Sequence, residues 1–182
     1  QLRYPVKITY GDGLLWISDS KANRILGVDL KNGNIEAQIG SGRPSFHDGD
    51  FQHAEFQSPQ GIVFNQGKLW VADSKNNLIR EIDLRAKKVK TIAGTGELGS
   101  SRIAKNHKAL EIAISTPLDL ALWNGGKEMV IAMAGGHQLW SYDFAKKTLN
   151  VLAGSGKEFI DDGVYPQNSL AQPSGLFEFK GN

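Results

Sequence analysis

The chain of 182 residues contains no cysteine, so it can form no disulfide bond and offers no thiol for catalysis or metal binding. This composition is compatible with a reducing compartment. The sequence also has no apolar run near the roughly 18 residues that a membrane-spanning helix needs, and no signal-like segment. With 22% charged and 40% hydrophobic residues, it has the composition of an ordinary globular protein with no membrane interaction.

Motifs of common catalytic and nucleotide-binding sites are missing as well. The sequence contains no Gly-x-Ser-x-Gly nucleophile elbow, no P-loop and no kinase signature. Its four histidines show neither an i, i+4 pair nor a short cluster of the kind that binds zinc. They are His47, His53, His107 and His137. We therefore predict no catalytic residues, no metal ligands and no cofactor.

What the sequence does contain is a threefold repeat. Each copy has a short apolar segment that ends in a polar turn, a second segment that ends in Asp, and a third that ends in Gly-x-Gly. The copies are residues 15–20, 25–30 and 39–42, then 69–74, 79–84 and 93–96, then 129–134, 139–144 and 153–156. A Pro-led apolar segment adds a fourth member at 59–64, 117–122 and 173–177, with 4–8 as its first copy.

Four short strands per repeat, with Gly-rich turns, are typical of a β-propeller blade. The runs are too short for the helix pairs of an α-solenoid. We predict an all-β protein with blade 1 at 4–42, blade 2 at 58–96, blade 3 at 116–156 and the first strand of blade 4 at 173–179. Three blades and a strand do not close a ring, so we expect part of a longer protein. A dimer of two half-rings is the alternative.

Aspartates recur at fixed places in the repeat and are predicted to fix turns, because a short carboxylate accepts backbone N–H groups. These residues are Asp19, Asp73, Asp29, Asp83, Asp143, Asp48 and Asp162. The alternative is a ring of carboxylates around a central metal, since carboxylate oxygens are hard ligands. The innermost strands offer only Asp119, which favours the turn interpretation.

In a four-stranded blade, the turns between the second and third strands emerge on the same side as the long connections between blades. Binding residues usually lie on such loops. The candidate partner-binding residues on this loop-rich face are Lys75, Asn77, Arg102, Lys105, His107 and His137. His137 follows the pair Gly135 and Gly136, which either permits positive φ angles in a turn or lets a ligand approach the backbone.

Basic residues exceed acidic ones between positions 75 and 108. Lysines on an outermost strand commonly prevent edge-to-edge pairing, and we favour that interpretation for 85–90. The alternative is a nucleic-acid surface that includes Lys75, Arg102, Lys105 and Lys108. Few exposed aromatic residues are expected there for base stacking.

Residues 59–84, with Pro-x-Gly-Ile, Trp-Val-Ala-Asp-Ser-Lys-Asn-Asn and Ile-Asp-Leu, resemble an NHL repeat. Residues 46–61, 131–140 and 171–175 narrow the resemblance to NHL proteins in which a thioredoxin-like domain precedes a six-bladed propeller. The resemblance implies that this chain is half of such a ring in a cytoplasmic protein, with the thioredoxin-like domain outside it. It supplies no catalytic residue.

Three functions remain open at this point. The first is a non-catalytic scaffold that binds a protein or peptide partner on the loop-rich face. The second is RNA binding, as in the NHL propellers of tripartite-motif proteins. The third, a metal-dependent lyase or lactonase, would need His or carboxylate ligands near the propeller axis, where Asp119 stands alone.

Overall fold

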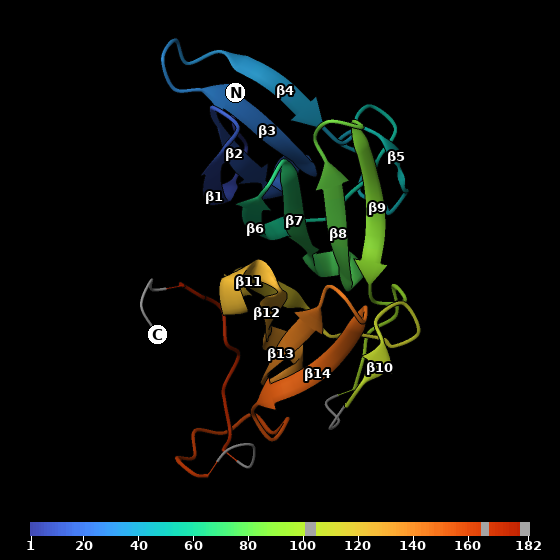
Figure 1. Cartoon of the computed structure of the whole chain (residues 1–182), viewed down its shortest axis with the longest axis vertical. Helices are drawn as coiled ribbons and strands as arrows, with labels where there is room; N and C mark the ends of the chain where they lie inside the picture. The colour runs from blue at the N-terminus through green and yellow to red at the C-terminus, as the bar shows by residue number, and fades with distance from the viewer. Residues whose placement is uncertain (101–104, 165–167, 179–182) are drawn as a thin grey trace.

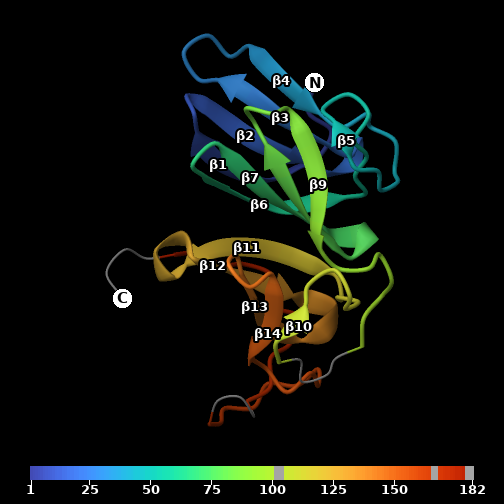
Figure 2. The ribbon, with the colours of Figure 1, turned by 45° about the vertical axis from the view of Figure 1, so that its right-hand side comes forward.

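The protein is described by a computed structural model that covers residues 1–100, 105–164 and 168–178. Three antiparallel sheets follow one another along the chain, and blade 2 lies between blades 1 and 3 (Figure 1 and Figure 2). Within the described residues, helix is limited to four 3-10 turns, none long enough to cross a bilayer. They are η1 (Ser20–Ala22), η2 (Ser74–Asn76), η3 (Asn124–Gly126) and η4 (Ala134–Gly136).

The predicted blades form in order along the chain, as part of a propeller. Blade 1 contains β1 (Pro5–Gly11), β2 (Leu14–Asp19), β3 (Arg24–Asp29) and β4 (Ile35–Ile39). Blade 2 contains β6 (Pro59–Asn65), β7 (Lys68–Asp73), β8 (Leu78–Asp83) and β9 (Lys88–Ala93). Blade 3 contains β11 (Pro117–Trp123), β12 (Glu128–Met133), β13 (Gln138–Asp143) and β14 (Thr148–Ala153). Consecutive strands are hydrogen-bonded neighbours.

Blades 2 and 3 each have a fifth strand that the sequence pattern did not predict. β5 (Gly49–Asp50) pairs with the outer strand β9, and β10 (His107–Lys108) pairs with β14. Each extra strand comes from the connection that leads into the blade it joins. Two residues are too few to show a period-2 pattern, so the expectation of four strands is corrected for these two blades.

The innermost strands β1, β6 and β11 lie along one side of the molecule, and β6 contacts both of the others (Figure 1). β6 and β11 approach so closely that a Cβ atom on Gly61 would lie 2.6 Å from the Cα atom of Asp119. Asp119 in turn accepts a hydrogen bond from Lys7 at 2.5 Å and from the backbone N–H of Leu176 at 2.7 Å.

The predicted first strand of blade 4 is not formed: residues 173–178 have no strand structure. The segment lies next to the inner strands of blades 1 and 3 through the contacts of Leu176 with Asp119 and Lys7. A strand needs a hydrogen-bonding neighbour, and the described part of the chain supplies none for this segment.

The hydrophobic core is divided between the two blade interfaces, because each sheet buries its face against the next blade. The core between blades 1 and 2 includes Trp16, Ile25, Phe56, Ile62, Leu69, Val71 and Ile82. The core between blades 2 and 3 includes Trp70, Ile79, Ile114, Leu120, Met129, Ile131 and Trp140. Blade 2 therefore packs on both of its faces.

Candidate functional site

The turn between the second and third strands ends the same way in each blade. A 3-10 turn is followed by one residue with left-handed backbone, and these residues are Asn23, Asn77 and His137, each with a φ of 53°. Asn, Asp and His are the non-glycine residues found most often in this conformation. The side chain at this position then accepts a backbone hydrogen bond from the residue that precedes the first proline of the next blade.

The three contacts are equivalent in geometry. Ser58 donates to Asn23 at 3.0 Å, Thr116 donates to Asn77 at 3.0 Å, and Gln172 donates to Nδ1 of His137 at 3.3 Å. Asn77 and His137, predicted as partner-binding residues, therefore link consecutive blades. Their role in partner binding stays a prediction.

The glycine pair before His137 does not supply the positive φ angle that the sequence suggested. Gly135 and Gly136 both have ordinary backbone within η4, and the left-handed residue is His137 itself. Gly135 instead fits closely against the preceding connection, since a Cβ atom there would lie 2.5 Å from Oγ of Ser115. Gly135 therefore serves packing within the protein, whereas a Cβ atom on Gly136 would make only an ordinary contact, 3.5 Å from Cβ of Met133.

Asp73 and Arg80 form a fully buried ion pair in blade 2, with 2.9 Å between Oδ2 and Nη1. Asp73 also accepts hydrogen bonds from the backbone of Gln57 at 2.7 Å and from Asn76 at 2.8 Å. Burial raises the pKa of Asp73 to about 6, despite the opposing effect of Arg80. The expected contact with the backbone of the following turn is absent, because the carboxylate instead holds the segment that enters the blade.

Asp19, the equivalent residue of blade 1, has the same role but the opposite pKa shift. It accepts hydrogen bonds from the backbone of Arg3 and Tyr4 at 2.8 Å and from Arg24 at 3.1 Å. Burial raises its pKa, but these donors together outweigh burial and hold the pKa below its usual value. Here too, the predicted contact with the following turn is replaced by contacts with the entering segment.

Three other aspartates accept backbone hydrogen bonds in the turns between the third and fourth strands. The donors are Lys31 for Asp29, Ala86 for Asp83, and Ala145 and Lys146 for Asp143, at 2.8–2.9 Å.

Asp48 differs from the turn-fixing role predicted for it. It attaches the extra strand of blade 2, since it binds Arg80 at 2.8 Å and the backbone of Thr91 at 3.0 Å. A carboxylate on this edge of the blade accepts hydrogen bonds from the adjacent strands, and so it does not fix the turn that follows it. Asp162 is exposed in the segment that follows β14.

The other predicted partner-binding residues that the structure describes lie on exposed segments, and their role in binding stays a prediction. Lys75 is exposed on η2, and Lys105 and His107 are exposed at or before β10. Arg102 lies outside the described residues. None of the described residues among these six lines the cavity described next.

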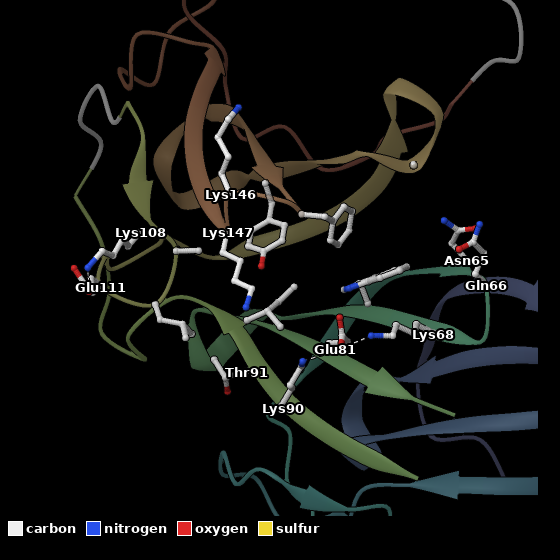
Figure 3. A pocket seen from close by; sticks show the side chains of 17 residues that line it. Asn65, Gln66, Lys68, Glu81, Lys90, Thr91, Lys108, Glu111, Lys146 and Lys147 are labelled. Carbon is white, nitrogen blue, oxygen red and sulfur yellow. Dashed lines mark hydrogen bonds and ion pairs between the residues drawn. The ribbon is translucent and has the colours of Figure 1, made fainter. Parts of the chain in front are cut away.

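A cavity of about 800 Å³ opens between blades 2 and 3 (Figure 3). Blade 2 contributes the end of β6 and the turn after it, β7, β8 and β9, and blade 3 contributes η3, β13, the turn after it and the connection around β10. Small-molecule and cofactor sites commonly have volumes of about 300–1,000 Å³, so the cavity is large enough for a ligand or a side chain of a partner.

One wall of the cavity is aromatic. Phe144 lies between the other two rings, with centroid distances of 4.9 Å to Trp70 and 5.2 Å to Tyr142. Burial and the nearby carboxylates of Glu81 and Asp143 raise the pKa of Tyr142 to about 12. The tyrosine therefore stays protonated at neutral pH and can donate a hydrogen bond.

The rest of the cavity rim is rich in lysine, as Figure 3 shows. Glu81 binds Lys68 at 2.9 Å and Lys90 at 3.1 Å. Burial raises the pKa of Glu81, but the two lysines outweigh burial and lower it overall. The carboxylate is thus ionised and already paired, which leaves it poorly suited to act as an acid or base.

The innermost strands β1 and β11 are joined by an ion pair between Lys7 and Asp119. Among the described residues there is no group of three or more His, Cys, Asp or Glu side chains that could hold a metal ion. Asp119, which the sequence placed at the axis, faces the ammonium group of Lys7 at 2.5 Å.

Sequence reasoning missed the cavity residues Trp70, Tyr142 and Lys147. Trp70 is the repeat equivalent of Trp16, so the pattern assigns both to the core. Lys147 belongs to a turn that resembles an ordinary exposed turn. Only the packing of one blade on the next brings these side chains to one place, and no local signal in the sequence could have shown it.

Comparison with known proteins identifies the repeat. The NHL repeat family matches residues 56–82. The chain is 38% identical to human NHL repeat-containing protein 2 over 96% of the chain and 27% of that protein. It is 40% identical to the Arabidopsis thaliana protein SUPPRESSOR OF QUENCHING 1, chloroplastic, over 96% of the chain and 17% of that protein. The chain thus spans about a quarter or less of these relatives.

A solved structure supports the fold. A Bacteroides thetaiotaomicron protein of unknown function superposes with a TM-score of 0.64 over 72% of this chain and 32% of its own, at 24% sequence identity. This likeness concerns the fold alone. The repeat match and the sequence identity to the relatives above show that the chain belongs to the NHL repeat family.

Proposed function

We propose that the chain is a non-catalytic part of a β-propeller that binds a protein or peptide partner in the cavity between blades 2 and 3. The observation that carries this proposal is the cavity itself, with an aromatic wall and a lysine-rich rim on a scaffold of strands. Such a combination of apolar surface and a few polar groups is characteristic of binding sites. The loop-rich face, where the sequence placed the site, uses Asn77 and His137 to connect blades.

The protonation states in the cavity favour binding over catalysis. Glu81 is held ionised by two lysines, and the phenol of Tyr142 has its pKa raised to about 12. General acid–base catalysis is most effective when the pKa of the catalytic group lies near the working pH. Neither group meets that condition.

RNA binding is the less favoured function. Four of the cavity lysines have carboxylate partners within 3.1 Å, namely Lys68 and Lys90 with Glu81, Lys108 with Glu111, and Lys146 with Asp143. Pairing of this kind reduces the positive charge available to phosphate groups.

We also propose that further blades and a thioredoxin-like domain complete the longer protein. The proposal is in line with the short share of its relatives that the chain spans.

The proposal is tested by placing the photo-cross-linking residue p-benzoylphenylalanine in the intact protein. One variant replaces Leu110, which lines the cavity and is 58% exposed. The control replaces Lys75, which is exposed on η2 and outside the cavity. We expect one partner to be cross-linked from position 110 and not from position 75. Cross-linking from position 75 alone would move the site to the loop-rich face, and none from either position would contradict a binding role.

A further inference from the structure

One buried donor in the cavity has no hydrogen-bond partner. Trp70 is 6% exposed, lines the cavity, and its indole Nε1 finds no acceptor in the structure. Buried polar groups in folded proteins are nearly always paired, because an unpaired one lowers the stability of the fold. The orphaned indole N–H therefore requires an explanation.

The other buried tryptophans show that the fold can satisfy such a group. Trp16, the repeat equivalent of Trp70, donates to the backbone oxygen of Gly11 at 3.1 Å. Trp140 donates to the side chain of Gln138 at 3.0 Å. Of these three tryptophans, Trp70 lines the cavity between blades 2 and 3, and it is the one whose indole N–H has no partner.

Lys147 supplies a second unused donor in the same cavity. Its side chain extends into the cavity, whereas that of Lys146 points in the opposite direction (Figure 3). Lys146 pairs with Asp143 at 2.8 Å, but no ion pair is formed by Lys147 within the described residues. The same cavity is therefore lined by the residues of an unpaired indole N–H and of an ammonium group, and by the rings of Tyr142 and Phe144.

We propose that the cavity binds a peptide segment in which an acidic side chain adjoins an apolar one. The carboxylate accepts hydrogen bonds from Trp70 Nε1 and Lys147, and the apolar side chain packs on Tyr142 and Phe144. This assignment rests on the proposed function and specifies the partner's chemistry. Charge complementarity supports it: the acidic groups of the cavity are already paired with lysines, and the donors left unused are those that a carboxylate satisfies.

Peptide capture by the intact protein tests the ligand class. The probes are 12-residue peptides on an array that combine Glu or Asp with a neighbouring Leu or Phe, and matched peptides with Gln or Asn in place of the acid. We expect the acidic peptides to bind at least about tenfold more tightly than the matched amides, as expected for a charge-assisted hydrogen bond worth about 1.5 kcal/mol or more.

Two pairs of variants locate the binding. Trp70→Phe removes the N–H and keeps an aromatic ring, and Lys147→Gln removes an exposed charge that folding does not need. Each is expected to weaken binding of the acidic peptides about tenfold. The matched controls are Trp16→Phe and Lys87→Gln, at residues that do not line the cavity, and they should leave the affinity unchanged. Lys87 is exposed and has the same left-handed backbone as Lys147.

The remaining outcomes separate the two proposals. Equal binding of acidic and amide peptides, or full binding by both Trp70→Phe and Lys147→Gln, would overturn the ligand class and leave peptide binding itself in place. If no peptide binds and no partner is cross-linked from position 110, both proposals fail. Single-stranded RNA that competes for the cavity with a steep salt dependence would also overturn the assignment.

Discussion

The side-chain oxygen of Asn77 lies 3.0 Å from the backbone nitrogen of Thr116, and this hydrogen bond joins the turn of blade 2 to the first residue before β11. Both residues have positive φ angles, as do the partners in the other two blades. The contact combines an unusual backbone conformation with a long-range hydrogen bond. It therefore couples neighbouring repeats, which in propellers and other repeat proteins interact mainly with the next unit.

Replacement of Asn77 separates these two contributions. Asn77→Gly keeps the left-handed conformation accessible but removes the acceptor, so we expect a loss of about 1 kcal/mol in unfolding free energy. Asn77→Ala also removes the acceptor and places alanine in the left-handed conformation, which its Cβ atom disfavours. This variant should therefore lose about 1 kcal/mol more than Asn77→Gly. Urea titration of the intact protein measures both. Equal stability of the glycine variant and the wild type would show that the hydrogen bond contributes nothing.

His137→Asn tests whether the histidine is a structural substitute for asparagine. Asn places an oxygen acceptor at the same left-handed position, as Asn23 and Asn77 do. We expect the unfolding free energy to change by less than about 0.5 kcal/mol. His137→Ala, which has no acceptor for the backbone of Gln172, should lose about 1 kcal/mol. A large destabilisation by asparagine would indicate that the imidazole has another role.

The sequence predicts the blades well because each strand leaves a local pattern. Asn23 and Asn77 also occupy the same place in the repeat, but the third copy has His137 there. Residue identity alone therefore does not reveal that all three side chains accept an equivalent backbone hydrogen bond. Trp16 and Trp70 show the opposite problem. They look identical in the pattern, yet one is satisfied within its blade and the other faces a cavity, because the neighbouring blade decides which.

Asp73 should make the stability of the protein depend on pH. Its folded-state pKa is raised to about 6 from 3.8, so the native state takes up a proton between these values while the unfolded state does not. The stabilisation is fully present below pH 3.8 and is lost as the pH rises through 6. A shift of about two pKa units corresponds to about 3 kcal/mol.

The measurement compares the wild type with Asp73→Asn by urea titration at several pH values. The unfolding free energy of the wild type should increase relative to the variant as the pH falls from about 7 to about 4. Asp19→Asn is the matched control. Because the pKa of Asp19 is lowered, its contribution is present above the unfolded value and is lost as the pH falls below it. The same pH trend for both variants would contradict the assignment.

Gly61→Ala should disturb the contact between the innermost strands. The added methyl group would lie 2.6 Å from the Cα atom of Asp119, and backbone cannot move aside as a flexible side chain can. We expect a destabilisation of about 1–3 kcal/mol. Gly175 occupies the equivalent place after Pro173 and has no neighbour within 4 Å, so Gly175→Ala is the control. Similar unfolding free energies for the two variants would show that β6 and β11 can separate.

The extra strands β5 and β10 have a consequence for protein synthesis. Residues 49–50 are translated before β9, and residues 107–108 before β14, so each short strand leaves the ribosome ahead of the outer strand with which it pairs. An unpaired outer strand is a template for association with other chains. In blades 2 and 3, the short strand that pairs with the outer strand is therefore already present when the outer strand appears. This order shortens the time during which neighbouring nascent chains could pair with the outer strand.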